Sequence, residues 1–467
     1  MPSPAEPAVE VPATLPGLQS LAELPDWLDA AVRPERALAA LLRAAPGLTG
    51  EVVGFESDRV RMRDDSGTWL ASYDLHLAGG GTVSLVGGLS RPDGGGRAPP
   101  AGTPGPPDWR IEVPELGLEL SAAPPESLEA VPVLTDADRA RPLLESAIRA
   151  GGQYPDLRID RCTAEIMRFK PGSRCTVRYR LESDGDGATG PDVVVAKTYH
   201  GSKGENAFDA MRALWSTPLA DGDVVNLAEP LAYLPDEHIL VQGPVPEETT
   251  LKDLVRDTFT AGDRDGLAVL ATELEKTADG LAALHRSEAW HGEVWTLDDE
   301  VDEVREQVER LAAVFPDRVA GSEALLDLVA AHGRATPADP VRPAHLSFRP
   351  AQVLLHGGRI GFIDFDGFGK AEPALDIALF LATVRSVALQ AAPPERELEL
   401  ATVLDELAGG FVQRYVAAAP VSVERVQLWE ALHLLTKVLH CWTKVRPRRL
   451  RFSLLLLERH LRATGLT

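Results

Sequence analysis

The sequence predicts an α+β protein in which a β-rich half precedes a mainly helical half. Between Arg161 and Val245, short β-rich runs alternate with turn residues, and after Glu247 the apolar residues recur mostly at helical spacing. A further β-rich stretch near the N-terminus predicts an additional α+β domain. We therefore expect four segments: a disordered N-terminus over 1–18, an accessory domain over 19–130, a β-rich lobe over 131–246 and a helical lobe over 247–467.

Composition and charge exclude several classes of partner. The 467 residues have a formal net charge of −23 and an isoelectric point near 4.9, which argues against nucleic acid or anionic membranes as partners. Three widely spaced cysteines lack metal-ligand or disulfide spacing, which is typical of a reducing cytoplasm. The N-terminus has no signal-peptide pattern, and no run of about 18 apolar residues predicts a membrane span. We expect a cytoplasmic protein.

The accessory domain is predicted from helix and strand patterns in turn. The first 18 residues are rich in Pro, Ala and Glu, which favours disorder. A helical pattern follows over 20–45, and the runs "WLASYDLHL" and "TVSLVGGL" then have strand character. The Gly/Pro-rich run over 91–108 predicts a loop, after which "WRIEVPELGLEL" resumes the strand pattern.

The β-rich lobe contains a similar unit with more regular strands. A helix, "DADRARPLLESAIRAG", precedes the hairpin "EIMRFKPGSRCTVRYRLE", the strand "DVVVAKTYH", the helix "GENAFDAMRALWSTP" and the strands of "EPLAYLPDEHILVQGPVP". The hairpins of both units share a Met-Arg start, a Gly and a Tyr-x-Leu, and their alignment places Gly87 opposite Lys197. One interpretation makes residues 19–130 a degenerate copy of the later lobe. The other is that hairpins of similar composition look alike.

Lys197 is the first candidate for chemistry. It lies near the end of an apolar run, and buried strands seldom contain lysine unless its charge has a partner. A carboxylate on the following helix would serve, and Glu205 and Asp209 are within reach along the sequence. The alternative is that Lys197 extends from the end of the strand to water.

Asp364 and Asp366 form a candidate metal site. They follow the apolar run "RIGFI", and the strand period of two would place both carboxylates on one side. Two carboxylates on one side repel each other unless a cation lies between them, which favours a divalent ion. Gln352 offers an amide oxygen, and Mg²⁺ prefers oxygen ligands. The alternative is a polar strand end closed by a turn at Gly367.

Four further polar residues have structural interpretations. His345 would hold its loop by hydrogen bonds, and Asp376 opens a helix, where a carboxylate caps backbone N–H groups or pins the loop. His285 and His291 are six residues apart and would lie on different faces of a helix. We expect these two histidines to be a helix terminus and a loop residue instead of a paired site.

Several motifs in a fixed order resemble the aminoglycoside phosphotransferase / choline kinase-type family, a branch of the protein-kinase-like fold. The family's His-x-Asp-x-x-x-x-Asn loop corresponds to the run from His345 through Ser347 to Gln352. Its Ile-Asp-x-Asp/Glu and Asp-Pro-Ala-x-Asp-Leu-Ala segments are similar to "IDFD" and "EPALDIA". With "RFKPGSRCTVRYRL", "VVVAKTY", "LVQGPVPEETTL" and "LAALHRSE", the resemblance covers residues 160–440.

This resemblance implies a two-lobed fold, with an antiparallel β N-lobe and a mainly helical C-lobe, that uses ATP or GTP with Mg²⁺. The implied binding residues are Lys197 for the nucleotide phosphates, Glu205 or Asp209 as its partner, backbone from Gln242 to Val245 for the adenine, and Asp364 and Gln352 for the metal.

Ser347 departs from the family pattern. The family has an aspartate there that orients the acceptor hydroxyl, whereas serine is uncharged and is no base without help. Phosphoryl transfer usually has a loose transition state, so positioning and electrostatics dominate, and loss of a base costs about 10²–10⁴-fold. The candidate catalytic residues are Ser347, His345 and, as a borrowed base, Asp366.

Two functions stay open at the level of the sequence. One is an ATP- and Mg²⁺-dependent phosphotransferase, weakened by Ser347, that acts on a hydroxyl of a small molecule, sugar or peptide. The other is a pseudokinase that serves as a nucleotide- or peptide-binding scaffold, or as a partner subunit in a biosynthetic complex. The acidic surface does not identify the acceptor.

Overall fold

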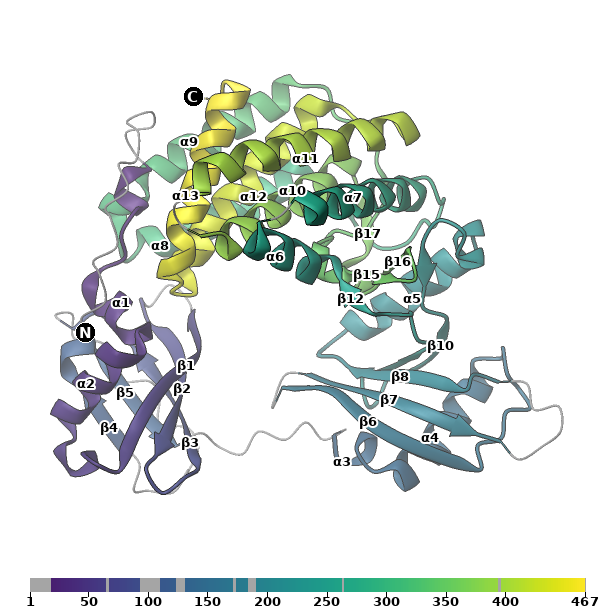
Figure 1. Ribbon diagram of the computed structural model, residues 1–467, viewed down its shortest axis with the longest axis horizontal. Coiled ribbons are helices and arrows are strands. Elements are labelled where there is room, and N and C mark those ends of the chain that lie inside the picture. The colour runs from purple at the N-terminus through teal and green to yellow at the C-terminus, as the bar shows by residue number, and fades with distance from the viewer. Residues whose placement is uncertain are drawn as a thin grey trace. The chain divides into compact units, whose positions relative to one another are not determined.

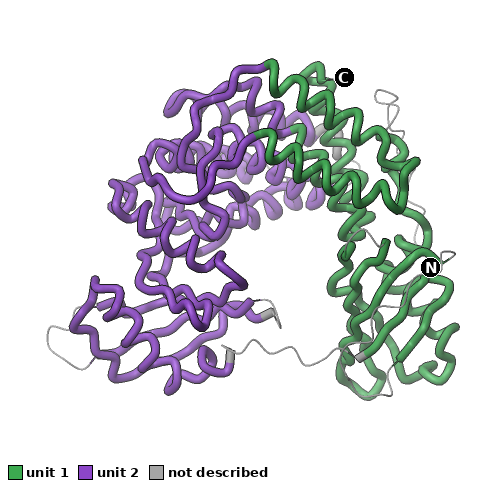
Figure 2. Tube along the Cα trace, turned by 180° about the vertical axis from the view of Figure 1, so that it is seen from behind, with its two compact units in different colours: residues 1–125, 297–335, 431–467 green, residues 126–296, 336–430 purple. Residues whose placement is uncertain are grey.

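The chain divides into two compact units (Figure 2). The computed structural model describes residues 18–63, 67–92, 110–122, 131–170, 174–183, 190–262, 264–393 and 396–466. Unit 1 comprises residues 1–125, 297–335 and 431–467, and unit 2 comprises residues 126–296 and 336–430. The predicted disorder up to residue 17, most of the predicted loop over 91–108 and the hairpin turn at 171–173 lie outside the described residues.

Unit 1 contains a five-stranded antiparallel sheet in the order β1-β2-β3-β5-β4 (Figure 1). Its strands are β1 (Val52–Met62), β2 (Trp69–Leu77), β3 (Thr82–Leu89), β4 (Arg110–Val113) and β5 (Leu118–Ala122). Every second side chain of β2 from Trp69 to Leu75 is buried, because successive strand residues point to opposite faces. The predicted helical stretch over 20–45 forms two helices, α1 (Asp26–Val32) and α2 (Pro34–Ala44), since a proline starts the second one.

Helices from the C-terminal part of the chain share the core of unit 1. They are α8 (Leu297–Ala312), α9 (Pro316–Ala335), α13 (Pro447–Thr464) and the end of α12 (Val423–Thr443). The ring of Trp69 on β2 lies 6.1 Å from that of Phe315, which lies 5.3 Å from that of Trp442. Trp69 also donates its indole N–H to the Trp442 carbonyl at 3.3 Å. The compact units therefore differ from the predicted 19–130 and 247–467 segments, because helical periodicity does not say which core a helix joins.

Unit 2 begins with a second five-stranded antiparallel sheet, in the order β10-β11-β8-β7-β6. Its strands are β6 (Arg161–Lys170), β7 (Arg174–Glu182), β8 (Val193–Thr198), β10 (Pro230–Leu234) and β11 (Ile239–Gln242). Helices α3 (Val131–Leu134) and α4 (Ala137–Ala150) precede the sheet, and α5 (Lys203–Trp215) follows β8. Asp136 starts α4 by accepting hydrogen bonds from two backbone N–H groups.

The two sheets have the same strand order. In chain order, both place the strands as first, second, third, fifth and fourth, and a helix pair precedes each sheet. This correspondence supports the predicted duplication, which stays a prediction. At Gly87, the residue aligned with Lys197, a Cβ would lie 1.7 Å from the Glu119 carbonyl oxygen. No side chain fits there, so the sheet of unit 1 has no equivalent of the lysine.

The rest of unit 2 is mainly helical. Its helices are α6 (Leu251–Ala261), α7 (Arg264–His285), α10 (Pro373–Ala391), α11 (Glu397–Ala418) and the start of α12. One small sheet joins β12 (Thr249–Thr250), β15 (Val353–His356), β16 (Arg359–Phe362) and β9 (Asn226–Leu227). Another joins β13 (Val294–Trp295), β17 (Gly369–Ala371) and β14 (Arg342–Ala344). These two sheets hold the loops that contain the predicted site residues.

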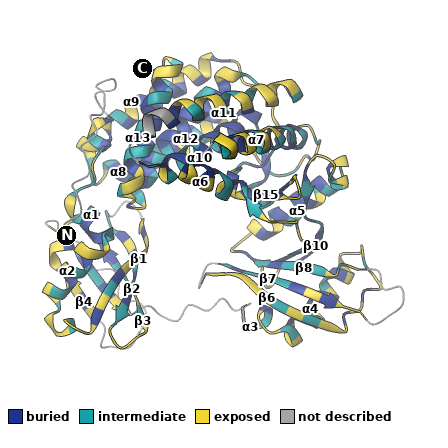
Figure 3. Cartoon of the chain, in the orientation of Figure 1, coloured by how far each residue is buried: buried dark blue, intermediate teal, exposed yellow. Residues whose placement is uncertain are grey.

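Helix α10 is long and apolar enough, by length and composition alone, to cross a membrane. This finding differs from the expectation, made from the sequence, that the chain has no apolar run long enough to span a membrane. Of its most apolar window, 61% is buried inside the protein (Figure 3), which is the pattern of a core helix.

Candidate active site

The predicted lysine and the first predicted aspartate meet in unit 2. Lys197 lies on the face of β8 opposite the buried Val194 and Ala196, so its side chain leaves the sheet core. Its ammonium forms an ion pair and hydrogen bond with the Asp364 carboxylate. The side chains are 14% and 20% exposed, and the ammonium lies 4.6 Å from the centre of the Tyr199 ring. The pair is thus largely shielded from water.

Neighbouring positive charges keep Asp364 ionised. Burial raises the pKa of this carboxyl, but the charge and hydrogen bond of Lys197, followed by the charge of Arg174, outweigh burial. The net pKa of Asp364 therefore lies below its ordinary value. Arg174 is the first residue of β7, directly after the hairpin turn, and the sequence did not single it out.

We expect the lowered pKa of Asp364 to make this pair's contribution to stability depend on pH. A depressed pKa in the folded state adds stability that is complete above the unfolded value of about 3.9 and is lost as the pH falls through the folded value. Unfolding free energies of the wild type and Asp364→Asn, measured from pH 6 downwards, should differ most at neutral pH and converge in acid. A difference that does not change with pH would contradict this expectation.

The predicted partners of Lys197 on α5 do not pair with it. Among the described residues, neither Glu205 nor Asp209 forms an ion pair with Lys197, and Glu205 is exposed. Its neighbour Asn206, about 100° around the helix, faces the loop after β16 instead. The Asn206 amide donates to the carbonyls of Asp366 and Phe368, both at 3.1 Å. Helix α5 therefore contacts the site by an amide and not by a carboxylate.

The two predicted aspartates are not strand neighbours. β16 ends at Phe362, Asp364 has a left-handed backbone with φ of 74°, and Asp366 lies in the 3-10 turn η6 (Phe365–Gly367). The prediction from strand periodicity is wrong in this respect, because a left-handed residue breaks the extended geometry. Both carboxylates nevertheless act on one neighbour: after burial, the charges of Asp364 and Asp366 raise the pKa of the Tyr199 phenol.

Buried hydrogen bonds fix the loop that contains His345 and Ser347. The backbone N–H of His345 donates to Asp376 at 2.7 Å, and the same carboxylate oxygen lies 3.1 Å from Nε2 of His285. Nδ1 of His285 lies 2.6 Å from the Tyr415 hydroxyl. The expectation that Asp376 pins this loop and that His285 ends a helix agrees with these contacts. The loop also stores backbone strain, since Leu346 has φ of 59°.

Ser347 lies between the histidine and the acidic turn. Its Oγ is 3.2 Å from Nδ1 of His345, and Nε2 of the same ring is 3.1 Å from the Ile363 carbonyl. A Cβ on Gly367 would lie 3.5 Å from the Ser347 Oγ, so the glycine leaves space beside the hydroxyl. Ser347 is partly buried and remains accessible.

The oxygen atoms present are compatible with Mg²⁺. Asp364 is ionised and Asp366 is close to the same tyrosine. The amide oxygen of Gln352 already accepts the Arg349 N–H at 2.8 Å, which closes the turn η5 (Pro350–Gln352). Within the described residues no three His, Cys, Asp or Glu side chains cluster. Mg²⁺ commonly takes one or two protein carboxylates and completes its shell with substrate phosphates and water, so this sparse set fits it.

The predicted adenine-binding backbone links the sheet to the helices. Gln242 ends β11, where it pairs with Val195 and Pro230. Val245 follows in an extended connection and reaches β16: a Cβ on Gly361 would lie 2.4 Å from the Val245 side chain. The structure thus places both residues in the connection between the two parts of unit 2 and leaves their role a prediction.

Comparison with known families identifies the class of protein. The model of the phosphotransferase enzyme family matches residues 179–409, which include every predicted site residue from Lys197 to Asp366. Residues 179–409 of the chain therefore resemble the phosphotransferase enzyme family. The predicted resemblance and the α+β, protein-kinase-like fold are confirmed. The match supports phosphotransferase chemistry with nucleotide and divalent metal in general.

The chain is similar to several solved structures. They include a glucosamine kinase (15% identity, TM-score 0.47, covering 91% of this chain and 98% of that one). They also include a choline/ethanolamine kinase family protein from Mesorhizobium loti (15%, 0.44, 71% and 99%) and a thermostable mutant of an aminoglycoside phosphotransferase (14%, 0.43, 68% and 99%). No protein with a curated description matches the chain.

Two residues near the candidate site, Arg174 and Asn206, escaped the sequence prediction. A basic residue directly after a glycine hairpin was the available signal for Arg174. No comparable signal marked Asn206, because single polar residues in a helix are common. His291 was expected to be a loop residue, and its Nε2 lies 3.0 Å from the Asn206 side-chain oxygen.

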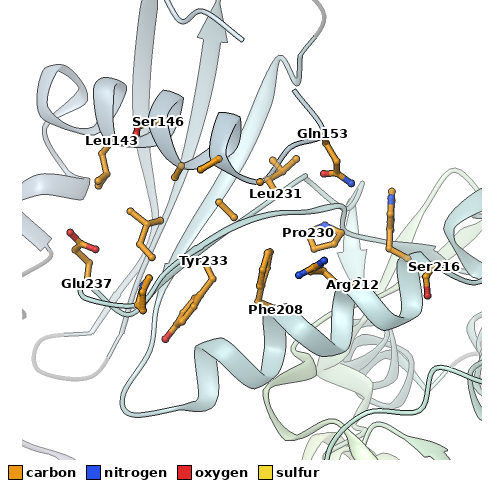
Figure 4. A pocket seen from close by; sticks show the side chains of 17 residues that line it. Leu143, Ser146, Gln153, Phe208, Arg212, Ser216, Pro230, Leu231, Tyr233 and Glu237 are labelled. Atoms are coloured by element: carbon orange, nitrogen blue, oxygen red, sulfur yellow. The ribbon is translucent and has the colours of Figure 1, made fainter. Parts of the chain in front are cut away.

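A cavity of about 740 Å³ lies elsewhere in unit 2, between α4, α5 and β10 (Figure 4). Phe208, Arg212 and Tyr233 line it, whereas Lys197 and Asp364 do not. Phosphoryl transfer needs a cation for the phosphates and a carboxylate for the metal, so the candidate active site is the ion pair and not this cavity.

Proposed function

We propose that the chain transfers the γ-phosphoryl group of ATP, with Mg²⁺, to a hydroxyl of a small molecule, sugar or peptide. The observation that supports this most directly is the ion pair of Lys197 and Asp364 beside the loop of His345. One ammonium and one ionised carboxylate converge there, which are the groups needed for nucleotide phosphates and for their metal. GTP is the alternative donor.

In this proposal, different residues of the chain have different roles in phosphoryl transfer. Lys197 and Arg174 attract the phosphate oxygens, and Asp364 holds the metal with Asp366 nearby. When bound, Mg²⁺ neutralises charge on the phosphates and orients them. Asn206 fixes the turn that contains Asp366 by binding its carbonyl, so both carboxylates keep their positions.

A pseudokinase is the second candidate function. Ser347 stands where the family has its aspartate, and the ammonium of Lys197 is already neutralised by Asp364. In this alternative the protein binds a nucleotide or a peptide as a scaffold or partner subunit, without transfer.

Labelled ATP tests the proposal directly. We expect the full chain with Mg²⁺ to transfer label to at least one compound in a hydroxyl panel that includes glucosamine, choline, ethanolamine and hygromycin B. Asp364→Asn should abolish transfer, and Asp236→Asn, at an exposed turn, serves as the matched control. ATP that raises the melting temperature without any transfer, even to water, would favour the pseudokinase.

A further inference from the structure

Ser347 has a neighbour that can take its proton. Its Oγ lies 3.2 Å from Nδ1 of His345, and Nε2 of His345 lies 3.1 Å from the Ile363 carbonyl oxygen. A carbonyl oxygen only accepts hydrogen bonds, so the neutral imidazole must have its proton on Nε2. Nδ1 is then unprotonated, and the serine hydroxyl donates to it.

The environment holds the imidazole in this orientation. The ring packs between Phe348 and Phe365, at centroid distances of 5.5 and 5.0 Å, and His345 is fully buried. The charged groups that face this residue are Asp376, which accepts its backbone N–H, and Asp364, with which it interacts electrostatically. A hydroxyl next to an oriented base is the arrangement that activates serine in enzymes.

We propose that Ser347 and His345 form a two-step proton relay that replaces the missing aspartate; this rests on the proposed function. The acceptor hydroxyl donates to Ser347 Oγ from the space beside Gly367, where a Cβ would lie 3.5 Å from that oxygen. As the acceptor oxygen bonds to the γ-phosphorus, the bond from phosphorus to the β–γ bridging oxygen breaks and ADP leaves with that electron pair. The acceptor's proton passes to Ser347, and the serine's proton passes to Nδ1 of His345. The imidazolium later returns its proton to water through Ser347.

The relay assigns different roles to the two residues. Ser347 touches the acceptor and is a catalytic residue, whereas His345 acts through it and is a positioning residue and proton acceptor. Substitution at 345 should therefore matter only when a serine is at 347. A purely structural histidine would cost the same in either background, which gives a readout that separates the two roles.

The test is a kinetic cycle on the full chain, with ATP and Mg²⁺ and with water or the acceptor found in the panel. We expect Ser347→Ala to lower kcat about 10²-fold with little change in the KM for ATP. Ser347→Asp should equal or exceed the wild type. His345→Gln keeps an N–H donor for the Ile363 carbonyl but has no basic nitrogen. This substitution should lower kcat about 10²-fold in the wild-type background and less than threefold in the Ser347→Asp background. Ser121→Ala, at an exposed residue of β5, is the control.

Each outcome of this kinetic cycle either supports or overturns the proposed relay. Equal rates for the wild type and Ser347→Ala overturn the relay and leave the proposed function standing. An inactive wild type with an active Ser347→Asp also overturns the relay, since the pair then does not replace the base. Inactivity of both overturns the relay and the proposed function together. Phosphate found on Ser347 by intact-mass and peptide analysis would show a nucleophile instead of a relay. An equal loss for His345→Gln in both backgrounds would reduce His345 to a structural residue.

Discussion

Replacing Lys197 with methionine is expected to lower phosphoryl transfer by about 10²–10³-fold, and Asp364→Asn by at least as much. The ammonium stabilises charge that develops on the phosphates in a partly buried site, where one such donor is worth about 10²–10³ in rate. The carboxylate positions the metal, which contributes several kcal/mol of transition-state stabilisation. The double variant should be little slower than the slower single variant, because residues that act as a unit are not additive.

The free energy of unfolding distinguishes a loss of phosphoryl transfer from a loss of the folded structure. Asp364→Asn leaves an ammonium without its counterion at a site that is only 14% exposed, and we expect a cost of about 1–3 kcal/mol. Lys197→Met leaves Asp364 with the charge of Arg174 nearby, so its cost should be smaller. Transfer of label and chemical unfolding are measured on the same preparations, with Lys252→Met on the exposed face of α6 as control. Wild-type rates in either single variant would remove the basis of the proposed site.

Much of the fold could be predicted from local patterns. β2 and β3 have the bounds of the runs "WLASYDLHL" and "TVSLVGGL", because flanking turn residues define their ends and alternating burial adds to the signal in β2. Lys197 and Asp364 could be singled out because each lies at or just beyond the end of an apolar run, where a charge needs a partner. The family motifs then related these two residues, which are 167 positions apart in the sequence.

The choice between neighbouring side chains could not be predicted. Glu205 has the charge that a partner of Lys197 needs, but it is Asn206 whose side chain points toward the loop after β16. One residue along a helix changes the direction of the side chain by about 100°. Sequence alone does not fix that rotation, which depends on how α5 packs. The same limit applies to α8 and α9. The spacing of their apolar residues predicts helices, but it does not predict that contact between Trp69 and Phe315 joins them to the N-terminal sheet.

Ser347 illustrates a different limit. The sequence indicated only that the family's aspartate is replaced at position 347. The function of a serine hydroxyl depends on which group accepts its proton, and the sequence does not identify that group. The strained backbone at Leu346 and the Ile363 carbonyl set the orientation of the neighbouring imidazole. Neither a left-handed residue nor a carbonyl direction has a signature in this stretch of sequence.

The largest effect on stability is expected at Arg425. Its guanidinium binds both oxygens of Glu372, one at 2.7 Å, and the two side chains are 2% and 7% exposed. Removing one partner of a buried pair leaves an uncompensated charge, so Arg425→Ala should destabilise unit 2 by about 3–5 kcal/mol. Glu372 also accepts the Asp339 N–H at 3.1 Å and starts α10, the helix that contains Asp376.

Two comparisons isolate burial as the cause. Arg414 makes an equally bidentate pair with Asp279, at 2.7 and 2.6 Å, but the side chains are 52% and 31% exposed. Arg414→Ala should therefore cost no more than about 1 kcal/mol, as exposed pairs do. Replacing Arg425 and Glu372 together with methionine should recover most of the loss, since apolar residues of similar volume need no counter-charge. Chemical unfolding with amide exchange along α10 measures all three; similar losses for Arg425→Ala and Arg414→Ala would mean that burial of the first pair does not raise the cost of breaking it.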